Sequence, residues 1–174
     1  MSAWIIALIV IAVVFVVYLL MGYLFYFLMK KKSKVVDSEM MKLNDHEVAD
    51  GKRILSIIDK LTKAKYSFDK EAYEEISKGV NNISSLNMNE RSKYKNVIDF
   101  VSVYLYKVYK EDKKYGSNIS SDDAAFLLSK RELNSDVYKS YNAAATAYNI
   151  YLQMFCTKFV LFIKREKYAN AIIF

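Results

Sequence analysis

The first thirty residues constrain the fold more than any other part of this chain. From Trp4 to Met29 the sequence contains no charged side chain and no proline. An α-helix rises about 1.5 Å per residue, so roughly 20 apolar residues are enough to cross the hydrocarbon core of a bilayer, which is about 30 Å thick. A segment inside lipid must be helical, because only a helix satisfies every backbone N–H and C=O within itself. The sequence therefore predicts a transmembrane anchor over residues 1–29.

Two other interpretations of this apolar stretch fit less well. A cleaved secretory signal needs a positively charged start and a small-residue cleavage site. The chain has no Lys or Arg before Trp4, and no A-x-A-like site follows the apolar run. A buried core helix rarely needs so long a stretch that is apolar on all faces. A membrane-spanning helix remains the preferred interpretation.

Four lysines follow the apolar stretch and predict its orientation. Lys30, Lys31, Lys32 and Lys34 form a basic juxtamembrane flank, residues 30–34. Because an excess of Lys and Arg stays on the cytoplasmic side, we expect the N-terminus outside and residues 35–174 in the cytoplasm. The expected location is the cell (plasma) membrane, with a single pass and the lipid bilayer as one partner.

Composition limits the chemistry that this chain can perform. Without the four flanking lysines the net charge of +7 falls to +3, so nucleic-acid binding is not expected. One cysteine, Cys156, and one histidine, His46, allow no internal disulfide and no zinc site of the usual kind. We interpret His46 as a solvated surface residue. There is no Gly-rich phosphate loop and no G-x-S-x-G motif, so the prediction is a non-enzymatic protein without a cofactor.

The absence of proline and the low number of glycines, four, indicate long helices joined by short connections. The predicted fold class is all-α, with a single N-terminal transmembrane helix followed by a three- to four-helix antiparallel bundle over residues 35–174. Apolar side chains at helical spacing predict the first bundle helix within residues 35–66. Its stripe comprises Ile54, Leu55, Ile57, Ile58 and Leu61, and Gly51 is expected to break, kink or weaken it.

Polar residues mark the expected ends of the later helices. Asp69 is predicted to cap the second helix and Asn89 the third, and Gly116 is predicted to stop the third. Either Ser120 with Asp123 or Ser121 with Asp122 is expected to open the last helical region, which includes a long helix from about Asn134 towards Lys164. Inward positions of that long helix recur at nearly heptad spacing: Val137, Tyr141, Ala144 or Ala145, Tyr148, Leu152, Phe155, Phe159 and Phe162.

A repeated motif lies on the same long helix. Tyr141-Asn142 recurs as Tyr148-Asn149 seven residues later, and Phe155 follows after seven more. Seven residues make two helical turns, so both Tyr–Asn pairs share one face. This pattern resembles the C-terminal helix of the LemA family of bacterial proteins, whose signature there is YN-x5-YN-x5-FP. The single N-terminal membrane helix is also similar to that family.

The resemblance implies a membrane-anchored helical bundle with no established enzymatic activity. The motif itself has two interpretations. Its tyrosines are core residues of the bundle, with the asparagines bonding to a neighbouring helix, or the face binds another protein, since tyrosine is enriched at interfaces. The predicted function is a scaffold or adaptor that binds a protein partner at the cytoplasmic face. The alternative is an accessory subunit of a larger membrane complex in secretion or envelope stress. A homo-oligomer is also compatible with the sequence.

Overall fold

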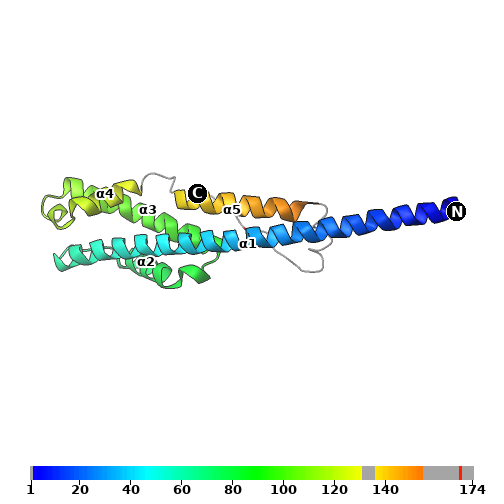
Figure 1. Ribbon diagram of the computed structural model, residues 1–174. Helices are drawn as coiled ribbons and strands as arrows, with labels where there is room; N and C mark the ends of the chain where they lie inside the picture. The colour runs from blue at the N-terminus through cyan, green and yellow to red at the C-terminus, as the bar shows by residue number, and fades with distance from the viewer. Residues whose placement is uncertain (1, 131–135, 155–168, 170–174) are drawn as a thin grey trace. The chain divides into compact units, whose positions relative to one another are not determined.

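A computed structural model describes residues 2–130, 136–154 and 169 of the chain. All regular secondary structure within these residues is helical, which confirms the all-α prediction (Figure 1). The helices are α1 (Ala3–Lys63), α2 (Lys70–Asn82), α3 (Met88–Glu111), α4 (Ser121–Ser129) and α5 (Asp136–Gln153), with short 3₁₀ turns η1 (Ile83–Ser85) and η2 (Gly116–Asn118).

The chain divides into two compact units. The first unit contains α1 up to Met40 and the chain from Ser140, which includes most of α5 and Ala169. The second unit contains the rest of α1, from Met41, and the helices that follow as far as Lys139. Because α1 and α5 each contribute to both units, neither unit corresponds to a single continuous segment.

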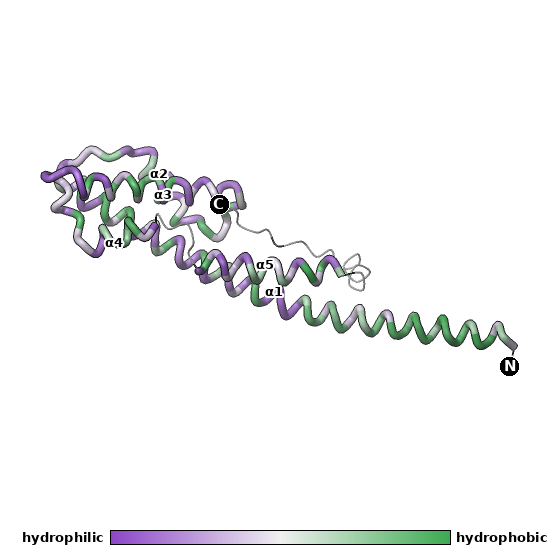
Figure 2. Tube along the Cα trace, turned by 90° about the horizontal axis from the view of Figure 1, so that it is seen from above, coloured by the Kyte–Doolittle hydropathy of each residue, from purple (hydrophilic) through white to green (hydrophobic). Residues whose placement is uncertain are grey.

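In the first unit, α1 changes from exposed on every side to buried along one stripe. Between Ala3 and Met21 its side chains are exposed, apart from a partly buried Tyr18. Figure 2 shows predominantly apolar residues along this stretch. From Gly22 onward a buried residue recurs every seven positions, at Gly22, Met29 and Val36. A repeat of seven is the spacing by which one helix packs against another.

The partner stripe in the first unit belongs to α5. Its buried residues are Tyr141, Ala145, Tyr148 and Leu152, as the heptad pattern predicted. The ring centroids of Phe25 on α1 and Tyr151 on α5 are 6.5 Å apart, so the two helices meet along this stripe. The expected extension of the last helix to Lys164, with Phe155, Phe159 and Phe162, lies outside the described residues.

The second unit has a core to which α1, α2, α3 and α4 all contribute. The predicted stripe at the end of α1 is buried at Ile54, Ile57, Ile58 and Leu61, and Leu55 is partly buried. Burial of each such side chain stabilises the fold by about 1.5–3 kcal/mol before entropy is counted. The other buried members of the core are Ile76, Ile83, Tyr94, Ile98, Val101, Leu105, Val108, Ile119, Ala124 and Leu127.

The predicted start of α2 is confirmed and that of α3 is wrong. Asp69 accepts a hydrogen bond from the backbone N–H of Glu71 at 3.0 Å and caps α2. The cap of α3 is Asn87 and not Asn89: Asn87 accepts from the N–H of Glu90 at 3.0 Å, while the Glu90 carboxylate accepts from the N–H of Asn87 at 2.9 Å. These two reciprocal hydrogen bonds satisfy backbone N–H groups that have no partner within the first turn of the helix. A cap at Asn89 would not satisfy both of them.

Gly116 does not end α3, contrary to the prediction. The helix ends at Glu111, and the side chain of Asp112 then accepts from the N–H groups of Lys114 and Tyr115 in a tight turn. Gly116 lies in η2, where a Cβ atom would approach the carbonyl oxygen of Tyr109 to 2.8 Å. Glycine is required there by close approach of the backbone, not by helix termination.

Gly51 does not break or kink α1, which continues through it to Lys63. Its role is to make room for Tyr94 of α3. A Cβ on Gly51 would collide with the Tyr94 hydroxyl, and one on Gly79 of α2 would collide with the Tyr94 ring. The hydroxyl donates to the carbonyl oxygen of Glu47 at 3.0 Å, which holds the ring in place between the two glycines.

We therefore expect Gly79→Ala to destabilise the fold, although alanine is the better helix former by about 1 kcal/mol. Overpacking against a fixed ring costs about 1–3 kcal/mol, which outweighs that gain. Urea unfolding of the full chain in detergent micelles, followed by circular dichroism, measures the difference. In a Tyr94→Leu background the obstacle is gone, so Gly79→Ala should no longer destabilise. A destabilisation of the same size in that background would show that Tyr94 is not the cause.

The N-terminus of α4 is tied to α1 through Asp123. Ser120 caps α4 by accepting from the N–H of Asp123 at 3.1 Å, as predicted. The Asp123 carboxylate then accepts from Lys60 at 2.9 Å and from Arg53 at 3.2 Å, both on α1. Burial alone would raise the pKa of Asp123, but hydrogen bonds from Lys60, Ser120 and Arg53 outweigh burial and hold the pKa below its usual value of 3.8.

This depressed pKa makes the fold sensitive to acid. Because the folded state binds the proton more weakly than the unfolded state, the stabilisation from Asp123 is present above pH 3.8 and is lost as pH falls through the folded pKa. We expect Asp123→Asn to lower stability at neutral pH and to flatten the loss of stability below pH 3.8 in urea unfolding measured at several pH values. Asp122→Asn, which removes the same charge from the same turn, is the control and should leave the acid dependence nearly unchanged.

Candidate functional site

The predicted basic flank lies within α1 and does not interrupt it. Lys30, Lys31, Lys32 and Lys34 are all exposed, and the helix runs through them from the apolar stretch into the second unit. Their side chains therefore project from a continuous helix, beginning about one turn after the exposed Phe27. That placement suits contact with anionic lipid headgroups, which is worth about 1 kcal/mol per lysine near a membrane surface.

The Tyr–Asn motif divides into buried rings and half-buried amides. Tyr141 and Tyr148 are 2% and 5% exposed, so their rings belong to the packed stripe of α5. Asn142 and Asn149 are half-buried. The Asn149 side chain contacts the main chain of Ala169 through two hydrogen bonds, of 2.7 and 2.9 Å. The fifth residue of the predicted face, Phe155, lies outside the described residues.

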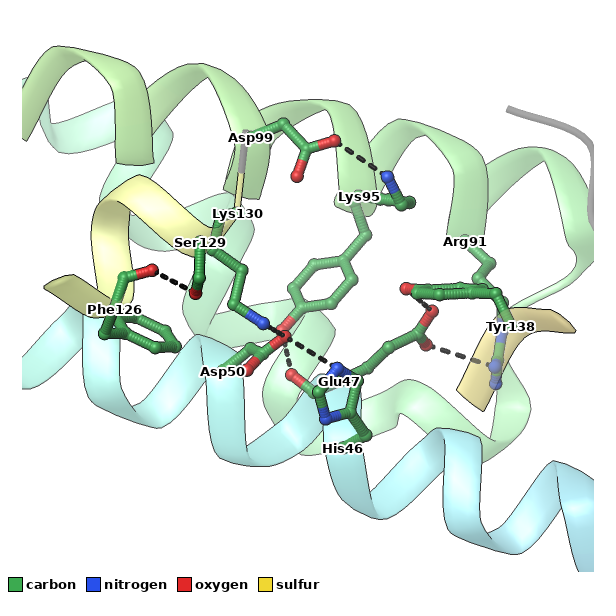
Figure 3. A network of polar contacts seen from close by, with 11 residues as sticks. His46, Glu47, Asp50, Arg91, Lys95, Asp99, Phe126, Ser129, Lys130 and Tyr138 are labelled. Atoms are coloured by element: carbon green, nitrogen blue, oxygen red, sulfur yellow. Dashed lines mark hydrogen bonds and ion pairs between the residues drawn. The ribbon is translucent and has the colours of Figure 1, made fainter. Parts of the chain in front are cut away.

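A buried ion pair in the second unit was not predicted from the sequence. Glu47 of α1 and Arg91 of α3 are each 3% exposed, and the Arg91 Nη1 lies 3.1 Å from the Glu47 Oε2. The Tyr138 hydroxyl of α5 donates to the other carboxylate oxygen, Oε1, at 2.7 Å. Figure 3 shows the Glu47 carboxylate between these two partners. Three helices therefore meet at one carboxylate.

Arg91 also bonds to groups around the ion pair. Its Nη2 donates to the carbonyl oxygen of Ile83 at 3.1 Å and to the side-chain oxygen of Asn44. Within the described residues, neither the Arg91 Nη1 nor the Glu47 Oε2 makes a hydrogen bond, so these two atoms interact as an ion pair. The pair is therefore held mainly by charge, which is strong where water is excluded.

A second layer of charges borders the ion pair, as Figure 3 also shows. Lys130, which follows α4, lies 2.5 Å from the Asp50 carboxylate of α1. The Nε2 of His46 lies 3.5 Å from the same carboxylate, so His46 is partly exposed and paired with Asp50 and is not simply solvated. Lys95 and Asp99 form a further pair on α3, at 2.8 Å.

Burial controls the ionisation of the two acidic partners. It raises the pKa of Glu47, although the Tyr138 hydrogen bond and the charge of Arg91 oppose this rise. Burial likewise raises the pKa of Tyr138, and the nearby carboxylate of Glu47 raises it further. The phenol therefore stays protonated over the physiological range and remains a hydrogen-bond donor to Glu47.

The cluster of Glu47, Arg91 and Tyr138 has no obvious reacting centre. Its charged groups face one another, and the surface grooves of the second unit are lined by other residues, among them Phe68, Tyr73 and Tyr104. Within the described part of the chain no group of His, Cys, Asp or Glu side chains is placed to hold a metal ion. A buried ion pair of this kind adds little net stability, but it penalises any packing that separates its partners. We interpret the cluster as a device that fixes helix register.

One signal in the sequence points to these residues in retrospect. Glu47 lies four residues after Leu43 and seven before Ile54, both fully buried, so it falls in the apolar stripe of α1. Arg91 lies three residues before Tyr94 and seven before Ile98 in the stripe of α3. Opposite charges within two apolar stripes are the pattern of a buried pair, because a lone buried charge is too costly.

Comparison with known proteins does not identify a family. No family model matches the chain, and neither curated proteins nor solved structures give a significant match. The resemblance to the LemA family therefore stays a prediction from the Tyr–Asn motif and the N-terminal apolar helix.

A double-mutant cycle on the buried pair tests the register interpretation. We expect Arg91→Met and Glu47→Leu each to destabilise the fold by about 3–5 kcal/mol, because each leaves the other charge buried without its partner. The double variant should lose much less than the sum, since no unpaired charge remains. Urea unfolding of the full chain in micelles gives the three values. Additive losses would contradict a direct coupling between the two side chains.

Proposed function

We propose that this chain is a membrane-anchored, non-enzymatic helical-bundle protein of the LemA type, which acts as a scaffold or adaptor for other proteins at the cytoplasmic face of the plasma membrane. One observation carries the proposal. The helix whose first part is apolar and exposed on all sides continues, through four exposed lysines, into the core of a folded helical unit. That is the arrangement expected of a single-pass anchor joined to an antiparallel bundle.

The dimensions of the exposed apolar stretch support membrane insertion. Ala3–Met21 is roughly 20 residues long, so as a helix it spans about 30 Å. Helix α1 is the one helix in the described residues that is long and apolar enough to cross a membrane. Apolar area left in water is unfavourable by about 25 cal/mol per Å², which makes a stretch exposed on every side unfavourable in solution but suited to lipid.

The pairing of the buried charged groups supports a scaffold rather than an enzyme. Glu47, Arg91 and Tyr138 contact one another in the second unit, and such groups contribute rigidity and not an open site for a substrate. A scaffold needs a stable surface at a defined place, which an anchored and register-fixed helical unit supplies.

Cysteine labelling in intact cells tests the topology. In a Cys156→Ser background, single cysteines are introduced at Ser2, before α1, and at Ser117, an exposed residue of η2. A membrane-impermeant thiol reagent should label Ser2→Cys from outside, and Ser117→Cys only after the membrane is permeabilised. Labelling of Ser117→Cys in intact cells would overturn the proposed orientation, and recovery of the chain in the soluble fraction would overturn the anchor.

In-cell crosslinking of the full chain tests the adaptor role. We expect specific proteins to be recovered with the wild type and with Thr146→Ala, an exposed change on α5, but in reduced amount with Asn149→Ala. Replacing residues 5–20 by leucine should leave this recovery intact, because a scaffold needs only the anchoring function of the span. Loss of the partners with the leucine span would instead support the accessory-subunit alternative, in which the span itself packs against other spans.

A further inference from the structure

A groove of the second unit opens beside the connection between α1 and α2. Its volume is about 510 Å³, within the range of roughly 300–1,000 Å³ that ligand sites occupy. The last turns of α1, the connection and the first turns of α2 all contribute to its lining. Three of the lining side chains are aromatic, Tyr66, Phe68 and Tyr73, and each is partly buried. We call this site the aromatic groove.

The way in which α1 ends places the rings in this groove. Lys65 adopts a left-handed φ of 67°, and the N–H of Tyr66 donates to the carbonyl oxygen of Leu61 at 3.0 Å. This Schellman end reverses the chain, so the connection returns beside the last turns of α1. The ring of Phe68 then contacts that of Tyr104 on α3, with the two centroids 6.1 Å apart. The groove is therefore built by contacts within the chain, before any ligand binds.

Negative charge dominates the lining of the aromatic groove. Its carboxylates belong to Asp59 of α1, to the α2 cap Asp69 and to Glu74 of α2, and its one cation is Lys70. Partial burial and the neighbouring carboxylate of Asp59 raise the pKa of Tyr73, so this phenol stays neutral at physiological pH. Neutral rings beside an excess of carboxylates favour a cation that also has an apolar face.

The same unit shows which cation suits such surroundings. The Cζ of Arg53 on α1 lies 4.5 Å from the centroid of the Phe126 ring, and its Nε lies 3.2 Å from the Asp123 carboxylate. A guanidinium is thus held by one ring and one carboxylate. Its flat face stacks on a ring while its edge donates to oxygen, a combination that a compact ammonium group lacks. The aromatic groove presents groups of the same two kinds, with no arginine among its own lining residues.

We propose that the aromatic groove binds an arginine side chain of a partner protein, with the guanidinium against the rings of Phe68 and Tyr73 and beside the carboxylates of Asp59 and Glu74. The inference rests on the proposed scaffold function and gives its partner a chemical class, a segment with an exposed arginine. Arginine is among the residues that contribute most to binding at protein–protein interfaces, which suits it to this role.

Methyl NMR of the full chain in detergent micelles tests the site directly. The chain contains three threonines, so labelling threonine methyl groups alone gives a simple spectrum. Thr62 lines the groove, and its hydroxyl donates to the carbonyl oxygen of Ile58 at 2.9 Å, which fixes the direction of its methyl group. We expect the capped peptide Gly-Arg-Gly to shift the Thr62 signal with a Kd of about 1 mM, and to leave that of Thr146 on α5 unchanged. A Thr62 signal that stays in place at ten times that concentration would overturn the inference.

Three altered peptides identify the chemical group that the groove recognises. Citrulline replaces the guanidinium by a neutral urea of the same shape, so its peptide should bind about tenfold more weakly than the arginine peptide. Lysine keeps the charge but not the planar group, and its peptide should also bind more weakly. Leucine should leave the Thr62 signal in place. Equal binding of the arginine peptide and any of these three would contradict a guanidinium site.

Matched variants identify the residues that bind the peptide. Tyr73→Leu removes a ring and should weaken binding about fivefold, whereas Tyr73→Phe keeps the ring and should bind at least as tightly as the wild type. Glu74→Gln should weaken binding by a similar factor. Glu71→Gln removes the same charge from the same helix outside the groove lining and should have little effect. Equal effects of Glu74→Gln and Glu71→Gln would show that general charge, and not the groove, attracts the peptide.

Two further measurements separate other occupants and the scaffold proposal. A shift of the Thr62 signal when the chain is concentrated without peptide would show that a second copy fills the groove, and would overturn the inference. If the arginine peptide does not bind while the topology is as expected and crosslinking recovers partners, this inference fails and the scaffold proposal stands. Binding of the peptide by a chain with the opposite topology in cells overturns the scaffold proposal alone.

Discussion

The ring of Tyr94 determines how closely the helices of the second unit approach one another. It fills the space that Gly51 of α1 and Gly79 of α2 leave open, and its hydroxyl bonds to the Glu47 carbonyl. Arg91, one turn earlier on α3, reaches the carboxylate of the same glutamate. The apolar core and the buried ion pair therefore depend on one placement of α3 against α1. A shift of one residue along α1 would both collide with the ring and separate the charges.

Helix α1 serves two different surroundings without a change of secondary structure. Its backbone hydrogen bonds are internal throughout, so the difference lies only in which side chains face outward. Up to Met21 all faces are apolar. From Gly22 onward one stripe is buried at intervals of seven, and charged residues occupy the other faces only from Lys30 onward. Such a helix can pass between environments of different polarity because a helix needs no partner for its main chain in either of them.

Local patterns were predictable from the sequence, and contacts between distant residues were not. The stripe of Ile54, Ile57 and Leu61 follows from spacing alone. The cap at Asn87 was also predictable, because Glu90 three residues later completes a capping box, whereas Asn89 lies directly before Glu90 and cannot form one with it. Gly51 was misread because its role depends on Tyr94, more than forty residues away, and no local property of glycine distinguishes a helix break from room for a neighbour's ring.

In the candidate site, too, local spacing was predictable and contacts between distant residues were not. Heptad spacing placed Tyr141 and Tyr148 on one face of a helix but left open whether that face was buried. The contact between Asn149 and Ala169 joins residues twenty positions apart, which no local spacing predicts.

The attachments of Lys130 to Asp50 and of Tyr138 to Glu47 have a further consequence. Both join neighbouring turns of α1, so any displacement of this part of α1 would move the end of α4 and the start of α5 together.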